Sequence, residues 1–192
     1  MLYSIQYIRA LAAISVVYYH LPTGYVTGSF GVDVFIVLSG YIMTKIIHEE
    51  IYFFNFIISR IKRVVPLYTL CTVLTIIAFK LGEKSLPALR QVDLTIINFF
   101  KSIFYIPYYN YSNHIRPILE VGWTLNLEMY FYIVCAIAIY LKNKISMYLT
   151  ITTIIIFVQI FCLLADGRDA LHEFYGDSII YEFIVGVFIF KF

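Results

Sequence analysis

Two ionisable side chains frame the first hydrophobic segment, RALAAISVVYYH, which begins at Arg9 and ends at His20. An α-helix turns about 100° per residue, so this spacing is three turns plus about 20° and puts both side chains on one face. A rise of 1.5 Å per residue separates their Cα atoms by roughly 16 Å. An Arg inside a membrane helix costs at least about 2.5–3.5 kcal/mol on insertion scales. We expect the pair to mark two ends of one polar track.

Carboxylates occur in three other hydrophobic segments. Asp33 lies near the start of the second segment, at a depth similar to that of His20, and a histidine beside a carboxylate forms a base with its orienting group. Asp33 shares a helical face with Gly40, where a missing Cβ lets another backbone or a ligand approach closely. Glu128 in WTLNLEMYFY and Glu182 in YEFIVG are the remaining candidates.

Each candidate also has a purely structural explanation. Arg9 can serve as an interfacial anchor of the positive-inside kind, and His20 can lie inert in the headgroup zone. Asp33 can act only on the N-terminus of its helix, where negative charge is favourable. Glu128 can make a structural hydrogen bond; its position well inside an apolar span makes it the hardest to dismiss.

The composition indicates an integral membrane protein. Of 192 residues, 61% are hydrophobic and 14% are charged, whereas soluble domains average about 45–50% apolar and about 25% charged residues. The net charge of +2 gives no reason to expect a nucleic-acid partner. The three cysteines lie in apolar runs without metal-binding spacing, so we predict no metal site.

Hydrophobic runs of about 20 residues predict membrane-spanning helices. A separate segment, 51–63, mixes aromatic residues with Arg60, Lys62 and Arg63, and predicts an amphipathic interfacial helix or a cytoplasmic hairpin. The stretch 82–121 predicts an outer loop that lies on the membrane or partly re-enters it. The fold class is therefore an all-α, polytopic bundle in a single domain, 1–192. We expect about six spans, near 4–20, 30–47, 64–81, 122–141, 145–165 and 175–192.

Basic residues predict the orientation of the bundle. With six spans, the densest clusters, SRIKR and KNK at 142–144, fall on one side, which should be the cytoplasm. The N-terminus and Lys191 then lie on that side too. The low Gly and high Ile, Tyr and Lys content suggests a bacterium with AT-rich DNA, and hence a multi-pass protein of the bacterial inner (plasma) membrane.

Five motifs, in order along the chain, resemble those of a known family. They are R-x10-H at Arg9 and His20, FIVLSG at 35–40, ISRIKRVVPLY at 58–68, WTLNLEMYFY at 123–132 and EFIVG at 182–186. Together they are similar to the membrane-bound acyltransferase family 3, which O-acylates surface polysaccharides and other exported acceptors. The resemblance covers nearly the whole chain. Phe35-Ile36 departs mildly from the family's Phe-Phe.

The resemblance implies transfer of an acyl group, most simply acetyl, from acyl-CoA to a carbohydrate hydroxyl, with no bound cofactor. Arg60, Lys62 and Arg63 would then dock the CoA phosphates, because guanidinium forks match phosphate geometry. Arg9 would hold the phosphate or pantetheine end of the donor. Ser39, as a hydrogen-bond donor, and Trp123 would also contact substrate.

The resemblance also suggests catalytic roles. His20 would deprotonate the acceptor hydroxyl or carry the acyl group transiently, and Asp33 would orient His20. Glu128 would be a second acid or base, or an anchor for Arg9.

Family members have more membrane helices than this chain offers. We therefore expect a C-terminally truncated form, whose missing half could be encoded separately downstream. Two other functions stay open: a proton-coupled transporter subunit, whose relay would use the same intramembrane ionisable residues, and an inactive membrane fragment.

Overall fold

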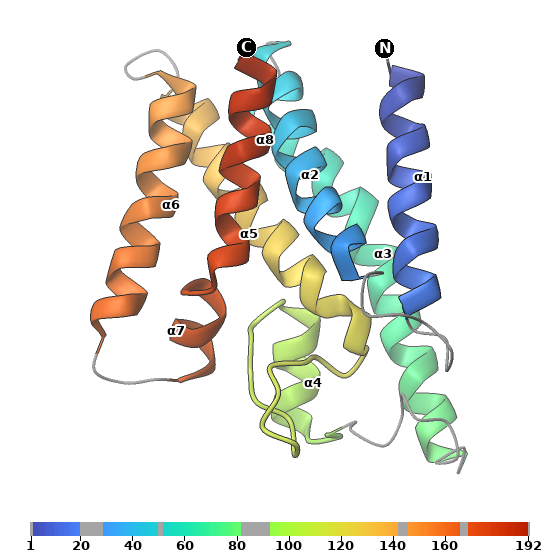
Figure 1. Cartoon of the computed structure of the whole chain (residues 1–192). Helices are drawn as coiled ribbons and strands as arrows, with labels where there is room; N and C mark the ends of the chain where they lie inside the picture. The colour runs from blue at the N-terminus through green and yellow to red at the C-terminus, as the bar shows by residue number, and fades with distance from the viewer. Residues whose placement is uncertain are drawn as a thin grey trace.

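The computed structural model describes residues 2–19, 29–49, 52–81, 93–141, 146–165 and 169–191. Within these ranges the regular elements are helices, which confirms the all-α membrane bundle. Figure 1 shows the long helices side by side, with both termini at one end and the short helices α4 and α7 at the other. The elements are α1 (Leu2–Tyr19), α2 (Phe30–His48), α3 (Phe53–Lys80), α4 (Ile96–Ile103), η3 (Glu120–Gly122), α5 (Trp123–Leu141), α6 (Met147–Leu164), α7 (Ala170–Tyr175), η4 (Ser178–Ile180) and α8 (Tyr181–Lys191).

Four stretches are long and apolar enough to cross a membrane: α2, α3, Glu120–Leu141 and α6. The chain is therefore a multi-pass membrane protein. Helices α1 and α8, which correspond to the first and last predicted spans, pack against α2 on either side (Figure 1). The predicted total of six spans stays a prediction.

Helix α3 corrects the prediction of a separate element at 51–63. It runs without a break from Phe53 to Lys80 and contains Pro66. Its buried residues, Phe56, Val64, Tyr68 and Thr72, recur at helical spacing on both sides of the proline. One continuous stripe against the bundle thus holds the two halves of the helix together, although proline removes a backbone hydrogen bond.

Helix α4 lies within the predicted outer loop, and it buries polar residues while exposing apolar ones. Its buried residues are Asn98 and Ser102, whereas Ile96, Ile97 and Phe100 are exposed. An apolar outer face suits contact with lipid rather than water. The helix begins where the Thr95 hydroxyl accepts a hydrogen bond from the Asn98 N–H at 3.1 Å.

The helix that corresponds to the last predicted span, 175–192, starts later in the structure than predicted. Helix α7 ends at Tyr175, and Asp177 starts the next turn by accepting a hydrogen bond from the Ile179 N–H at 2.9 Å. Helix α8 itself begins at Tyr181 and has 11 residues.

The core is held by a close contact between α2 and α8. A Cβ added at Gly40 would meet the carbonyl oxygen of Phe183, and one at Gly186 would meet that of Val37. The predicted close approach at Gly40 is confirmed, and the approaching group is a backbone. Small residues at such crossings are typical of membrane helix pairs. Phe183 also stacks on Phe131 of α5, with ring centres 3.9 Å apart.

Candidate active site

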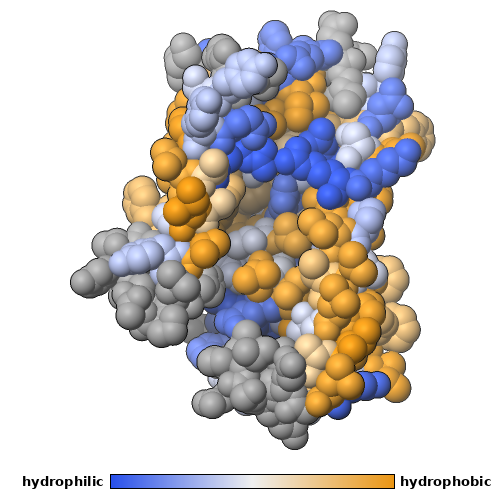
Figure 2. Space-filling model, turned by 90° about the vertical axis from the view of Figure 1, so that its right-hand side faces the viewer, coloured by the Kyte–Doolittle hydropathy of each residue, from blue (hydrophilic) through white to orange (hydrophobic). Residues whose placement is uncertain are grey.

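A cavity of about 560 Å³ lies between α1, α2 and the start of α5. Figure 2 looks at the face that α1 and α3 form, on the right of Figure 1. This face is hollowed between two largely hydrophobic columns, and hydrophilic residues gather above the hollow, toward the end with both termini. The polar lining residues are Arg9, Tyr19, Ser29, Ser39, Arg116, Glu120, Trp123, Thr124 and Glu128.

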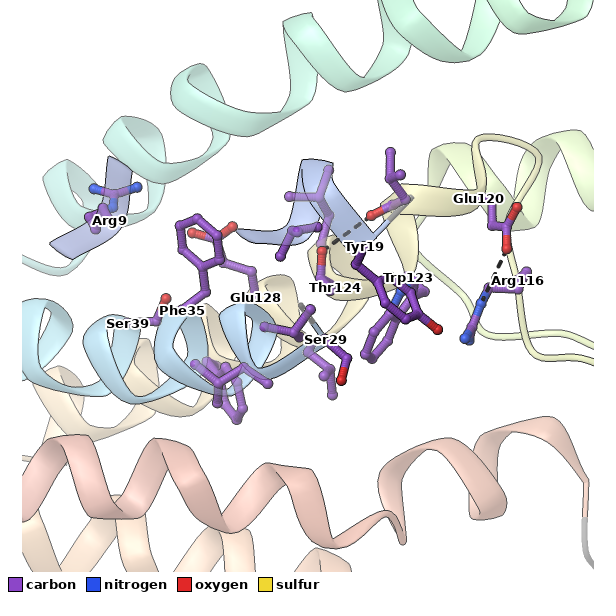
Figure 3. A pocket seen from close by; sticks show the side chains of 17 residues that line it. Arg9, Tyr19, Ser29, Phe35, Ser39, Arg116, Glu120, Trp123, Thr124 and Glu128 are labelled. Carbon is purple, nitrogen blue, oxygen red and sulfur yellow. Dashed lines mark hydrogen bonds and ion pairs between the residues drawn. The ribbon is translucent and has the colours of Figure 1, made fainter. Parts of the chain in front are cut away.

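One end of the cavity combines a cation with a carboxylate. Figure 3 shows Arg9, Ser39 and Glu128 toward this end, contributed by α1, α2 and α5. Arg9 interacts electrostatically with Glu128. Ser39 reaches the cavity because it follows Val32 and Phe35 on one face of α2 at helical spacing.

Glu128 connects the cavity to a group of arginines on α3. The hydroxyl of buried Tyr132, one turn further along α5, donates a hydrogen bond to Glu128 Oε1. Tyr132 interacts electrostatically with Arg60 and Arg63, and Arg9 does so with Arg63. Arg9 thus lies near Glu128, while Arg60 and Arg63 lie near Tyr132, the hydrogen-bond partner of Glu128.

Arg60 is held within the bundle by aromatic rings. Its Cζ lies 5.6 Å from the ring centre of Phe56 and 6.0 Å from that of Tyr132, distances typical of cation–π contacts. Its Nε donates to Ser59 Oγ at 3.3 Å. Within the described part of the chain, its buried Nη1 has no hydrogen-bond partner. A buried guanidinium N–H without a partner is uncommon in folded proteins.

The opposite end of the cavity is built around Trp123. The Cζ of Arg116 lies 4.9 Å from the centre of the Trp123 ring, and Arg116 Nε lies 4.0 Å from Glu120 Oε1. Figure 3 shows these three side chains at the far side of the cavity from Arg9.

The structure therefore brings most predicted site residues together. Arg9, Ser39, Trp123 and Glu128 line the cavity itself. Arg60 and Arg63 do not line it but lie next to its Arg9 end, through Tyr132. Their predicted roles stay predictions.

The positions of two other predicted residues, His20 and Asp33, need separate comment. His20 lies outside the described residues; Tyr19, directly before it, lines the cavity. Asp33 is absent from the lining, because it shares the α2 face of Val37 and Gly40 that meets α8. There it interacts electrostatically with Glu182. Its predicted pairing with His20 involves a residue outside the described ranges and stays untested.

Sequence reasoning missed two features of this site. Tyr132 follows Glu128 by four positions on α5, a spacing that puts both on one face and could have revealed the pair. Arg116 and Glu120 have the same spacing but precede the helix, so helical periodicity gave no reason to expect their place beside Trp123.

We predict that Glu128 stabilises the arginine end of the cavity through its contacts with Tyr132 and Arg9. Replacing Glu128 by alanine should lower the free energy of unfolding by about 1.5–3 kcal/mol, the range for hydrogen bonds to charged groups. Glu128→Gln should cost less, because an amide oxygen still accepts from Tyr132. Thermal unfolding in detergent measures both changes. The control is Ile133→Ala, at a residue of the same helix that is 60% exposed. A Glu128→Ala protein no less stable than this control would contradict the prediction.

Comparison with known proteins gives the family. The family described as "Acyltransferase domain" matches residues 2–192. The exopolysaccharide production protein ExoZ of Rhizobium meliloti is 31% identical over 167 residues, which are 86% of this chain and 51% of that protein. The putative peptidoglycan O-acetyltransferase YrhL of Bacillus subtilis is 27% identical over 93% of this chain and 31% of its own length.

A third relative, the peptidoglycan O-acetyltransferase OatA of Listeria monocytogenes, is 32% identical over 68% of this chain and 23% of its own length. No solved structure matches. The chain thus spans about half, or less, of the length of these curated relatives. Because the family match runs over nearly every residue, the chain belongs to the acyltransferase family.

Proposed function

We propose that this chain transfers an acyl group, most simply acetyl, from acyl-CoA to a hydroxyl group of a cell-surface or exported carbohydrate. The observation that carries the proposal is the cavity itself. It has Arg9 and Glu128 at one end, beside two further arginines, and an aromatic, polar wall around Trp123 at the other. The names of the relatives, two O-acetyltransferases and an exopolysaccharide production protein, support the reaction and the acceptor class.

The donor is proposed to bind at the arginine end. Arg9, Arg60 and Arg63 supply fixed positive charge where acyl-CoA has its phosphates, and guanidinium groups bind phosphate through paired hydrogen bonds. The hydrophilic band above the hollow in Figure 2 lies toward the end that holds both termini. We place this end on the cytoplasmic side of a bacterial inner membrane, because acyl-CoA is made in the cytoplasm.

The transfer step exchanges a thioester for an ester. A base takes the proton of the acceptor hydroxyl, whose oxygen forms a bond to the acyl carbon. The bond from that carbon to the CoA sulfur breaks, and the thiolate leaves with the electron pair and then takes up a proton. We assign the base to His20. If His20 is instead a carrier, its ring nitrogen bonds to the acyl carbon as the CoA thiolate leaves. The acceptor oxygen then bonds to that carbon, the bond from carbon to the ring nitrogen breaks, and the freed imidazole takes up the hydroxyl proton.

Other residues position the reactants. Ser39 Oγ is suited to donate a hydrogen bond near the arginine end of the cavity, and Glu128 holds that end together through Tyr132. A second acid or base role for Glu128 stays open. For Asp33, whose side of α2 meets α8, orientation of His20 stays a proposal.

We predict that Arg63 contributes to donor affinity. Arg63 is exposed yet lies within electrostatic reach of Arg9, so it is accessible to a phosphate. Arg63→Gln should raise the KM for acetyl-CoA about tenfold, corresponding to loss of one charge-assisted hydrogen bond, and should change kcat little. The control is Lys45→Gln, which removes a cation whose ion pair is with Glu49. Equal KM values for Arg63→Gln and wild type would remove Arg63 from the donor site.

The function is tested directly by transfer. The chain is reconstituted in nanodiscs with radiolabelled acetyl-CoA and a polysaccharide acceptor, and both free CoA and labelled acceptor are measured. Stoichiometric CoA release and acceptor labelling support the proposal. Absence of both, in a preparation that remains folded and monodisperse, overturns it for this chain.

A further inference from the structure

A second cavity, of about 230 Å³, adjoins the first at the end of the molecule that holds α4 and α7. The two cavities share Arg116, Trp123 and Leu127 in their walls. A ligand extended past Trp123 would therefore occupy both. The volume lies below the roughly 300–1,000 Å³ of pockets for drug-sized molecules, so it suits a single small ring and excludes a nucleotide.

The walls of this second cavity combine hydrogen-bonding side chains with apolar surface. Asn113 and His114 line one side, and Glu173 and Asp177 line the other. Carboxylates accept hydrogen bonds, while amide and imidazole groups both donate and accept. Sugar hydroxyls also do both, and the indole of Trp123 offers an apolar face for packing against the C–H groups of a sugar ring. This mixture matches a carbohydrate better than an anion or a lipid chain.

The cavity is preformed by interactions that fix both walls. Asn110 Oδ1 accepts hydrogen bonds from the backbone N–H groups of Ser112 and His114, at 3.0 Å each. Asn113 has a φ of 56°, the left-handed conformation that asparagine tolerates in tight turns. The Tyr109 hydroxyl then ties this turn to α7 by donating to Glu173 Oε2 at 2.7 Å. That bond raises the pKa of the Tyr109 phenol, so the donor keeps its proton.

We propose that the second cavity is an acceptor subsite, which binds one sugar ring of the carbohydrate while the adjacent ring presents its hydroxyl in the first cavity. The inference rests on the proposed function, since it names the place where that acceptor is held. Trp123 and Arg116 form the boundary between the two rings. Asn113, His114, Glu173 and Asp177 contact the bound ring.

Trp123 is the single tryptophan of the chain, so intrinsic fluorescence reports on the shared wall. The chain in nanodiscs is titrated, without any acyl donor, with chitotetraose and separately with maltotetraose. We expect a saturable change in tryptophan emission with at least one of these tetrasaccharides. No change with either tetrasaccharide overturns the subsite.

Variants of the two walls localise the response. Glu173→Gln keeps an acceptor for Tyr109 but removes the charge, and should weaken binding about tenfold. The double variant Asn113→Gly with His114→Ala removes both side chains of the opposite wall, and glycine at position 113 still adopts the left-handed backbone. This variant should weaken binding at least as much as Glu173→Gln. The control is Ser112→Ala, an exposed position in the same turn that does not line the cavity. Binding unchanged in both wall variants overturns the subsite.

The fluorescence response and the transfer assay separate the two proposals. A response lost in the wall variants, from a chain that releases no CoA, supports the subsite and contradicts the acyl transfer. If the chain labels the acceptor but its fluorescence does not change with either tetrasaccharide, the result contradicts the subsite and supports the acyl transfer.

Discussion

Replacing Gly186 by leucine should separate α8 from α2 and unfold the end of the bundle. A Cβ at this position would meet the carbonyl oxygen of Val37 and lie 2.9 Å from the backbone nitrogen of Tyr41. Because these atoms belong to a backbone, no rotamer change can make room, and the two helices must move apart. Overpacking in a closely packed core costs about 1–3 kcal/mol. We expect about 3 kcal/mol or more here, since the contact involves two main chains.

The loss should extend beyond α8 itself. Phe183 lies one turn before Gly186 and stacks on Phe131 in the core, so a displaced α8 also withdraws this ring from α5. The measurement is thermal unfolding of the detergent-solubilised chain, with limited proteolysis to detect a released α8. The matched control is Val185→Leu, at a neighbouring position that is 51% exposed. If both variants unfold at the wild-type temperature, the tight α2–α8 contact is absent from the protein.

The class of fold follows from composition and hydrophobic run length, because the bilayer imposes one length on every spanning helix. The predicted helix boundary between 51–63 and 64–81 was wrong because tertiary packing, not local sequence, sets where this helix begins. The sequence around Arg60, Lys62 and Arg63 has the charge of an interfacial segment. Phe56 and Val64 are nevertheless buried against the bundle as part of one stripe of α3. Burial of that stripe outweighs both the local charge and the helix-breaking tendency of Pro66.

The site could be predicted in part for a related reason. Arg9 and Glu128, both singled out as charges in apolar spans, line the cavity, since a charge in an apolar span has few tolerable places. The spacing of Asp33 and Gly40 also correctly indicated one face. It did not tell which neighbour that face meets, and the structure shows that the neighbour is α8. A one-helix pattern fixes which residues share a face; only packing shows what lies opposite.

Replacing His20 by alanine should lower the rate of acyl transfer by about 10²–10⁴-fold, the usual contribution of a general base, while leaving the bundle folded. Tyr19, the residue before it, reaches the first cavity, and none of the described residues that line this cavity is a histidine. A matched control is Val17→Ala, on the same helix at a position that is 64% exposed. Transfer should be unchanged in that control.

Labelling of the unsubstituted protein distinguishes the two roles that His20 can have. Incubation with radiolabelled acetyl-CoA but no acceptor leaves an acyl-carrying histidine labelled, whereas a base leaves the protein unlabelled. In both cases His20→Ala abolishes labelling of a carbohydrate added later, and Arg9 with its neighbouring arginines should still bind CoA, because those contacts do not depend on the imidazole. Full transfer by the His20→Ala protein would remove the histidine from the reaction. The chemistry would then pass to Glu128, the one carboxylate that meets both the cavity and Arg9 within the described residues.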